Sequence, residues 1–168
     1  MATIFLMCGF LGAGKTTVSR QLAKEYDAEY MNVDTHVMQM FSDAEYEHNW
    51  EKCFVAAEED LWQKIVRCAR DNKNVVFDVG FWTRKSRDMA RMRARQIGIT
   101  PMVYYVFAPD EILKKRIAQR LGKIAENNIK NFDTIKLMFE EPQANEDFIR
   151  IDNYYKIFGS RFGERAIP

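Results

Sequence analysis

Short apolar runs alternate with amphipathic stretches along most of this chain. An apolar run without helical period, ended by a glycine or a polar residue, is typical of a buried strand. Such runs predict strands at residues 3–8, 28–33, 74–79, 102–107 and 148–151. Apolar positions at helical spacing predict helices at residues 15–26, 50–70, 83–96, 109–121 and 154–162.

This alternation predicts an α/β fold, a three-layer parallel sheet flanked by helices on both faces. The 168 residues have the length of one domain, which we expect to span residues 1–168. The composition, 47% hydrophobic and 29% charged, is that of an ordinary globular protein and excludes global disorder. The formal net charge of +1 does not require a nucleic acid or a membrane as partner, so partners must be inferred from sites.

Three widely spaced cysteines, Cys8, Cys53 and Cys68, include no CxxC pair, which argues against a zinc site and a disulfide framework. They are typical of thiols in a reducing compartment. The first ten residues contain no basic leader, and their apolar run is too short to span a membrane. We therefore expect a cytoplasmic enzyme or binding protein without a membrane partner.

The sequence GFLGAGKT, residues 9–16, matches the pattern GxxxxGK(S/T) between a predicted strand and a predicted helix. Its glycines let backbone N–H groups converge on phosphate oxygens, and the helix N-terminus adds partial positive charge. Lys15 would reach the terminal phosphates and Thr16 would bind Mg²⁺. The predicted nucleotide-binding residues are Gly9, Gly12, Ala13, Gly14, Lys15, Thr16 and Thr17. A tight turn without a ligand is the alternative.

Other motifs indicate what the nucleotide is used for. A GTPase needs a DxxG switch and an NKxD base reader, but DVG at 78–80 is one residue short and DNKNV at 71–75 lacks the aspartate. A motor-type ATPase usually places a glutamate directly after the strand-end aspartate, where this chain has Val79. These departures favour phosphoryl transfer to an acceptor other than water.

Two aspartates, Asp34 and Asp78, stand at the carboxyl ends of predicted strands, the edge where such sheets bind ligands. One can deprotonate an acceptor hydroxyl and the other can hold Mg²⁺ through water, and we assign the acceptor to Asp34 and the metal to Asp78. Capping of the following segment is the alternative for each. His36 is a further candidate for the substrate site, although a lone histidine is more often structural.

Four arginines at helical spacing form a basic stripe on the helix predicted at 83–96, namely Arg84, Arg87, Arg91 and Arg95. Cations in the first turn oppose the helix dipole by about 0.3 to 1 kcal/mol each, and a bound anion would remove the conflict. We therefore predict that Arg84 and Arg87 contact the substrate. We expect Arg91 and Arg95 on a solvated face.

Arg116 and Arg120 lie four residues apart, hence on one face of the helix predicted at 109–121. Arginines brought over the phosphates by a mobile segment would neutralise charge that develops during transfer. Both are therefore candidate catalytic residues, together with Lys15 and Asp34. A surface helix with long basic side chains is the alternative.

Five stretches together carry a resemblance to a known family: GFLGAGKTT, NVDTHV, VVFDVGFWTRKSRDMAR, PDEILKKRIAQRL and FEEPQANED. They resemble the P-loop kinase-like proteins of the AAA_33 group, which are similar to the kinase domain of polynucleotide kinase, chloramphenicol phosphotransferase and the zeta toxins. The resemblance covers nearly the whole chain and implies a nucleoside-kinase-like fold that phosphorylates a hydroxyl with ATP and Mg²⁺. It also implies that Asp34 is the acceptor base and that a lid at about residues 112–132 supplies Arg116 and Arg120.

Three hypotheses stay open. The first is an ATP-dependent phosphotransferase that moves the γ-phosphoryl group to a hydroxyl of a small molecule or nucleotide-sugar. The second makes the acceptor an RNA or DNA 5′-hydroxyl end, although polynucleotide kinases typically carry an arginine three residues after the base, where this chain has Val37. The third is a non-catalytic, nucleotide-dependent switch that binds a protein. The sequence names neither the acceptor nor the oligomeric state.

Overall fold

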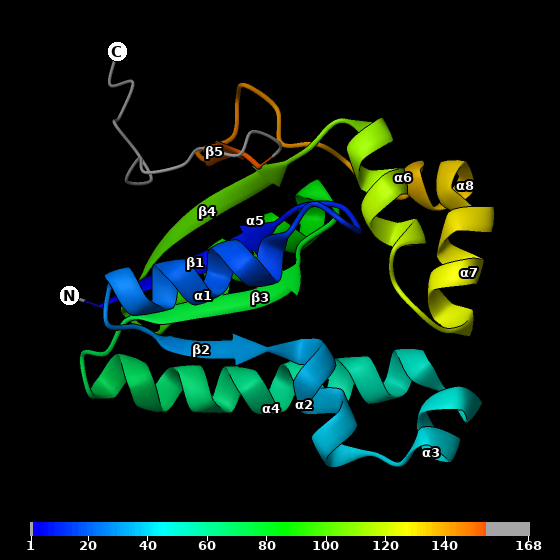
Figure 1. Ribbon diagram of the computed structural model, residues 1–168. Helices are drawn as coiled ribbons and strands as arrows, with labels where there is room; N and C mark the ends of the chain where they lie inside the picture. The colour runs from blue at the N-terminus through cyan, green and yellow to red at the C-terminus, as the bar shows by residue number, and fades with distance from the viewer. Residues whose placement is uncertain (1, 154–168) are drawn as a thin grey trace.

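Five parallel strands form one sheet within residues 2–153, the part of the chain that the computed structural model describes (Figure 1). Their order across the sheet is β2-β3-β1-β4-β5, and each neighbouring pair is parallel. The strands are β1 (Thr3–Cys8), β2 (Glu29–Asn32), β3 (Val75–Gly80), β4 (Thr100–Phe107) and β5 (Ile149–Asp152). The sheet confirms the parallel α/β arrangement predicted from the sequence.

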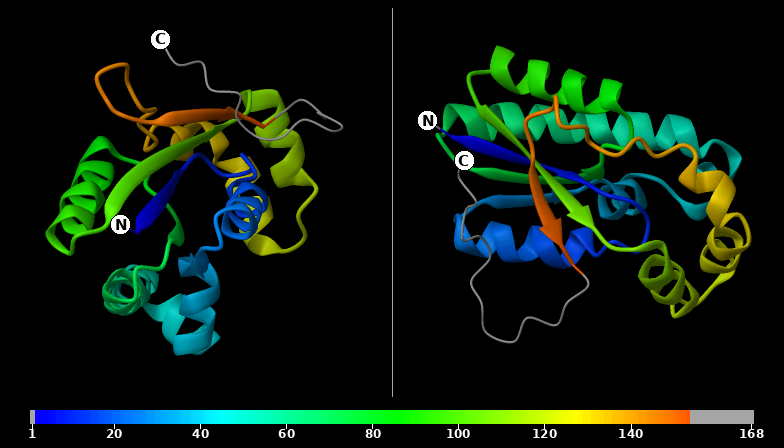
Figure 2. Two further views of the ribbon diagram at one scale, coloured as in Figure 1. Left: turned by 90° about the vertical axis from the view of Figure 1, so that its left-hand side faces the viewer. Right: turned by 90° about the horizontal axis from the view of Figure 1, so that it is seen from above.

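Helices cover both faces of this sheet. Helix α1 (Lys15–Glu25) lies on one face, whereas α4 (Trp50–Arg70) and α5 (Arg84–Gln96) lie on the other (Figure 2). Right-handed crossovers explain the division, because the chain crosses the sheet in one direction from β1 to β2 and in the opposite direction from β2 to β4. The other helices are α2 (Val33–Met40), α3 (Asp43–His48), α6 (Asp110–Ala118), α7 (Lys123–Lys130) and α8 (Phe132–Lys136).

The central strands are buried on both faces. Every side chain of β1 from Ile4 to Cys8 is at most 2% exposed, and the first three residues of β3 are 0% exposed. Trp62 of α4 packs edge-on against Phe77 of β3, with ring centroids 5.2 Å apart. Continuous apolar runs suit strands that are covered on both sides. They give the carboxyl edge of the sheet a rigid base, and helices α6 to α8 gather beyond that edge (Figure 1).

Most predicted element bounds agree with the structure to within three residues, and the helix predicted at 50–70 is α4, Trp50–Arg70. Strand β4 begins earlier than predicted and contains Pro101. Thr100 donates its N–H to the carbonyl oxygen of Ala2, the residue just before β1, at 2.9 Å, so the nitrogen of Pro101 points the other way. On that side the pairing with β5 begins only at Tyr104, and the missing N–H of Pro101 therefore interrupts no ladder.

The sequence pattern does not predict the short helices α2, α3, α7 and α8, each of eight residues or fewer. The first two begin at side-chain caps: Asn32 accepts the N–H of Thr35 at 2.8 Å, and Ser42 forms a capping box with Glu45. The helix predicted at 154–162 lies outside the described residues. None of the helices within residues 2–153 is long and apolar enough to cross a lipid bilayer.

Candidate active site

The phosphate loop, residues 9–16, connects β1 to α1 at the carboxyl edge of the sheet (Figure 1). Gly9 is packed so tightly that a Cβ there would lie 2.6 Å from the carbonyl oxygen of Val106. Gly14, the N-cap of α1, has a φ of +90° in the left-handed region, and a Cβ there would collide with the side-chain amide of Asn153. Glycine is therefore required at both ends of the loop.

Lys15 folds back over this loop. Its Nζ donates hydrogen bonds to the carbonyl oxygens of Gly9 at 2.9 Å and Phe10 at 3.2 Å. Burial lowers the pKa of Lys15, although the charges of Asp78 and Asp34 act in the opposite direction. No side chain caps the N-terminus of α1, and its first turn contains no acidic residue. The loop, its lysine and this helix N-terminus together suit the phosphates of a nucleotide.

Thr16 and Asp78 form an oxygen pair beside the loop, with 3.2 Å between Thr16 Oγ1 and Asp78 Oδ2. Asp78 is 3% exposed, and the same oxygen accepts hydrogen bonds from the Tyr30 hydroxyl and the Asn32 amide at 3.2 Å each. Burial, with the charge of Asp78, raises the pKa of Tyr30 to about 12, so Tyr30 stays a donor.

The Thr16–Asp78 oxygen pair can be compared with the ligands that the expected Mg²⁺ requires. Within residues 2–153 no group of three or more His, Cys, Asp or Glu side chains is placed to hold an ion. Mg²⁺ does not need such a cage, because it usually keeps several waters and binds through one or two carboxylates and substrate phosphates. One carboxylate and one hydroxyl next to a phosphate loop therefore fit Mg²⁺, and Asp78 and Thr16 would hold it.

Asp34 lies in the first turn of α2 and not at the end of a strand, because β2 stops at Asn32, whose side chain caps the helix. Its side chain is exposed, yet the surrounding protein removes enough water to raise its pKa. The charge of Asp78 adds to this rise, whereas Lys15 and Arg120 oppose it. Asp34 thus belongs to one electrostatic group with the lysine of the loop and the carboxylate of β3. A carboxylate with a raised pKa suits a general base.

Arg116 of α6 supports the phosphate loop from outside. Its Nη1 donates to the carbonyl oxygens of Gly12 at 3.3 Å and Ala13 at 3.2 Å, and its Nη2 donates to the carbonyl oxygen of Asn153 at 2.7 Å. The Asn153 side chain donates to the same Ala13 carbonyl at 2.7 Å. In this structure the guanidinium of Arg116 therefore binds backbone and holds the loop in shape.

Arg120 takes a different position from Arg116. It is exposed just beyond the end of α6, and its positive charge acts on both Lys15 and Asp34. Of the two arginines, Arg120 is the one that lies with the candidate reacting groups.

Thr17 is exposed in the first turn of α1, one residue after the threonine of the oxygen pair.

His36 is bonded to α4 and to no residue of the phosphate loop. It is 8% exposed, and its Nε2 lies 2.6 Å from Asp60 Oδ2 and 3.5 Å from Lys64 Nζ. The hydrogen bond from His36 is the main cause that lowers the pKa of Asp60. This contact ties α2, the helix that carries Asp34, to α4. The predicted contact of His36 with substrate gains no support from these bonds.

Arg84 and Arg87 are engaged by carboxylates of the chain itself. Arg87 is 0% exposed and forms a two-point ion pair with Glu146. The backbone N–H of Arg84 donates to Glu140 Oε2 at 2.7 Å, and its Nε donates to Asp88 at 2.9 Å. The anions expected at the N-terminus of α5 are therefore supplied internally. Every nitrogen of the Arg87 guanidinium donates within the protein, so these bonds give no support to the predicted contact of Arg87 with the substrate.

The other two arginines of the basic stripe, Arg91 and Arg95, differ in burial. Arg91 is only 8% exposed, and it donates to Asp88 at 2.9 Å and to the carbonyl oxygen of Asp147 at 2.8 Å. The expectation of a solvated Arg91 is wrong, because the segment 140–147 packs over this part of α5. Arg95 is exposed, as expected.

Four residues that bind the candidate site groups and the arginines of α5 are not predicted from the sequence: Tyr30, Asn32, Glu140 and Glu146. Tyr30 and Asn32 lie two residues apart in β2, so their side chains share a face, and the register pairs Asn32 with Asp78. Strand alternation is thus a signal that could have identified them. Glu140 and Glu146 lie in a polar segment without periodicity, and no local pattern connects them to α5.

A parallel sheet with a phosphate loop, its lysine and a threonine–aspartate pair defines a P-loop nucleotide-binding protein. Residues 4–142 match the model of the AAA_33 family, described as an AAA domain. The match covers most of the chain, and the chain belongs to this family.

Several proteins similar to this chain are named as kinases. A shikimate kinase from Caldicellulosiruptor bescii is 27% identical over 115 residues, which cover 67% of this chain and 62% of that relative. A sugar kinase structure from Janibacter sp. has a TM-score of 0.65 at 18% identity, covering 90% of this chain and 86% of the other. A gluconokinase structure from Sinorhizobium meliloti has a TM-score of 0.62 at 16% identity, covering 92% and 83%. At these identities the two structures support the fold alone.

Proposed function

We propose that this chain is an ATP-dependent kinase that transfers the γ-phosphoryl group to a hydroxyl of a small molecule, nucleotide-sugars included. The observation that carries the proposal is the phosphate loop with Lys15 folded over it and the Thr16–Asp78 oxygen pair beside it. The charges of Lys15 and Asp78 also act on Asp34, whose pKa burial raises. A base beside phosphate-binding groups is what phosphoryl transfer to a hydroxyl requires. The names of the similar proteins, shikimate kinase and gluconokinase, agree with a small-molecule acceptor.

In the proposed reaction, the acceptor oxygen attacks the γ-phosphorus of ATP. A new O–P bond forms as the bond from the γ-phosphorus to the bridging oxygen breaks, and ADP leaves with that oxygen. Asp34 takes the proton of the hydroxyl. Lys15 and Arg120 stabilise the charge that spreads over the phosphoryl oxygens. Mg²⁺ bound by Thr16 and Asp78 would neutralise further phosphate charge.

Two observations weigh against a nucleic-acid end as the acceptor. Val37 occupies the position where polynucleotide kinases typically carry an arginine, and it is a core residue, 4% exposed. Arg87 and Arg91, two members of the predicted basic stripe, are buried and bonded to protein groups. They are therefore not available to follow a nucleic-acid backbone, which favours a small hydroxyl compound.

The experiment is ADP release from ATP and Mg²⁺ in the presence of separate acceptor classes, with the phosphorylated product identified by mass spectrometry. The classes are sugars, sugar acids, shikimate, nucleosides, nucleotide-sugars and short oligonucleotides with a 5′-hydroxyl. We expect one small-molecule class to stimulate ADP release and to gain one phosphoryl group. Stimulation by oligonucleotides alone, or by no acceptor at all, contradicts the proposal.

Asp34→Asn tests the base. This variant should lose a factor on the order of 10² to 10⁴ in transfer rate, the usual contribution of a general base, while ATP binding changes little. Asp71→Asn is the matched control, because Asp71 is an exposed aspartate that follows α4 at the opposite edge of the sheet. Full activity in Asp34→Asn, or an equal loss in both variants, would remove Asp34 from the mechanism.

A further inference from the structure

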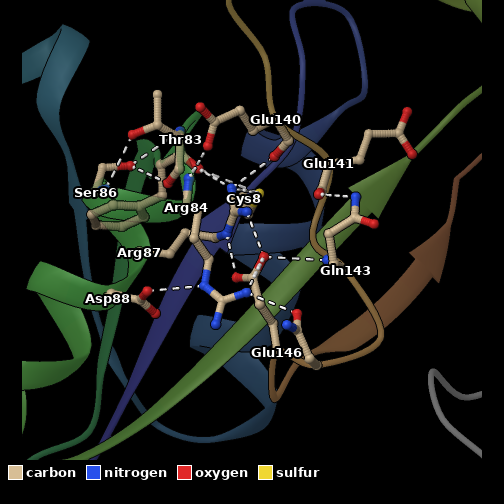
Figure 3. Close-up of polar contacts among 12 residues, drawn as sticks. Cys8, Thr83, Arg84, Ser86, Arg87, Asp88, Glu140, Glu141, Gln143 and Glu146 are labelled. Atoms are coloured by element: carbon tan, nitrogen blue, oxygen red, sulfur yellow. Dashed lines mark hydrogen bonds and ion pairs between the residues drawn. The ribbon is translucent and has the colours of Figure 1, made fainter.

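A buried ion pair links α5 to the segment 140–147, which runs from α8 toward β5 (Figure 3). The side chains of Arg87 and Glu146 are both 0% exposed. Arg87 donates from Nε to Glu146 Oε2 at 2.8 Å and from Nη2 to Glu146 Oε1 at 2.7 Å. Such a two-point contact fixes the plane of the guanidinium as well as its position.

The remaining nitrogen of Arg87 binds backbone from two separate parts of the chain. Nη1 donates to the carbonyl oxygens of Phe81 at 3.2 Å, Trp82 at 3.4 Å and Glu140 at 2.9 Å. Arg87 thus joins the turn after β3 to the segment 140–147. Burial alone would raise the pKa of Glu146, but hydrogen bonds from Arg87 and from the backbone of Gln143 lower it to about 2.

The turn that Arg87 holds is strained and borders the phosphate loop. Phe81 has a φ of +39°, a left-handed conformation that is unfavourable for a bulky aromatic residue. The preceding residue, Gly80, accepts the N–H of Gly9 of the phosphate loop at 3.3 Å. The thiol of Cys8 also donates to the Phe81 carbonyl, at 3.5 Å. A strained turn persists where its surroundings hold it, and here Arg87 and Cys8 supply the holding bonds.

We propose that Arg87 and Glu146 are positioning residues of the kinase site: they hold residues 80–82 against the phosphate loop as one wall of the acceptor pocket. The inference rests on the proposed function, because it assigns this wall to the acceptor. Arg87 touches no reacting group, since its guanidinium is buried, and it acts through the turn. Segment 140–147 follows the helices beyond the sheet edge, so the same pair couples that region to the wall.

The test combines hydrogen exchange with kinetics in Glu146→Gln, which keeps the shape of the side chain and removes its charge. Asp147→Asn is the matched control, an exposed neighbour with the same change in charge. Arg87→Lys is the second variant, because it keeps the positive charge and loses the fork that reaches Glu146 and three carbonyl groups. All measurements are made well below the unfolding temperature of each variant.

We expect the hydrogen-exchange rate of the backbone amides at residues 80–86 and 140–147 to rise about tenfold or more in both Glu146→Gln and Arg87→Lys. The amides of β1 and α1 should stay protected. The acceptor KM should rise with little change in the KM for ATP, and Asp147→Asn should match the wild type. Unchanged exchange at residues 80–86 overturns the inference. A rise spread evenly over the whole sheet also overturns it, because the pair would then contribute global stability only.

The two proposals fail in different ways. If the wild type phosphorylates none of the acceptors, the proposed function fails, while the exchange measurement still decides whether the pair holds the turn. If transfer occurs and both kinetic constants are unchanged in Glu146→Gln and Arg87→Lys, the positioning role fails and the kinase assignment stands.

Discussion

Two of the charged clusters within residues 2–153 differ in the net direction of their pKa shifts, although burial acts on both in the same way. At the phosphate loop, burial moves both groups toward their neutral forms: it lowers the pKa of Lys15 and raises that of Asp34. Behind the turn after β3, burial would also raise the pKa of Glu146, but the hydrogen bonds of Arg87 and Gln143 reverse the effect and lower it to about 2.

The difference separates a binding site from a structural support. A charged form that burial disfavours is stabilised when a partner of opposite charge arrives, and phosphate oxygens are such a partner for Lys15. Glu146 already receives donors at both carboxylate oxygens and gains nothing from a ligand. The shifted pKa of Lys15 therefore belongs to a group that a bound anion would stabilise, whereas the shifted pKa of Glu146 belongs to a completed structural contact.

The largest expected effect comes from Lys15→Met, which removes the charge from the first cluster. Transfer should fall about a thousandfold, the order seen when one donor to developing charge is lost. The unfolding temperature without ligand should not fall, because the folded state no longer has to bury a charged ammonium group. Thermal unfolding of the wild type and of Lys15→Met, with and without ATP and Mg²⁺, is the measurement. The ligands should raise the unfolding temperature less in Lys15→Met than in the wild type, and an equal rise in both would contradict the role of Lys15.

A smaller effect is expected from Glu146→Gln, which removes charge from the second cluster. Breaking a buried pair at one partner should cost about 3 kcal/mol of unfolding free energy at pH 7. The folded pKa of Glu146, about 2, lies below the ordinary value of 4.5, so the stabilisation is complete above pH 4.5 and is lost as the pH falls toward 2. Urea unfolding at several pH values should show the two proteins converging in acid, and a constant difference would contradict the assignment.

The smallest effect concerns the stability of Asp34→Asn. A raised carboxyl pKa means that the folded state binds its proton more tightly than the unfolded chain, so ionised Asp34 lowers stability at neutral pH. Asp34 is exposed and screened by water, so the gain in Asp34→Asn should stay below about 1 kcal/mol. In the wild type, the acid limb of kcat/KM should lie above the ordinary aspartate value of about 3.9. A loss of stability in Asp34→Asn would show that the carboxylate is a structural cap.

The fold is readable from the sequence because its signals are local. The apolar runs of β1 and β3 and the glycine pattern of residues 9–16 each specify their own conformation. The phosphate loop, its lysine and the Thr16–Asp78 pair follow from that motif and from the rule that parallel strands bind ligands at their carboxyl ends.

The arginines show where local reasoning ends. The conflict between basic residues and the N-terminus of α5 is real, but its solution lies more than 50 residues away, at Glu140 and Glu146. A helix pattern gives the face on which Arg87 lies and contains no information about the segment that covers that face. The same holds for Arg116, whose partners include Asn153 at the end of the described chain.

The contact between Asn153 and the phosphate loop has a consequence for protein engineering. Asn153 lies 140 residues from Ala13 in sequence, yet its side chain binds the phosphate loop and excludes any side chain at Gly14. A fusion point or truncation placed directly after β5 would remove that support and would alter nucleotide affinity without touching the loop sequence. The minimal unit for protein engineering therefore extends at least through Asn153, beyond the end of the family match at residue 142.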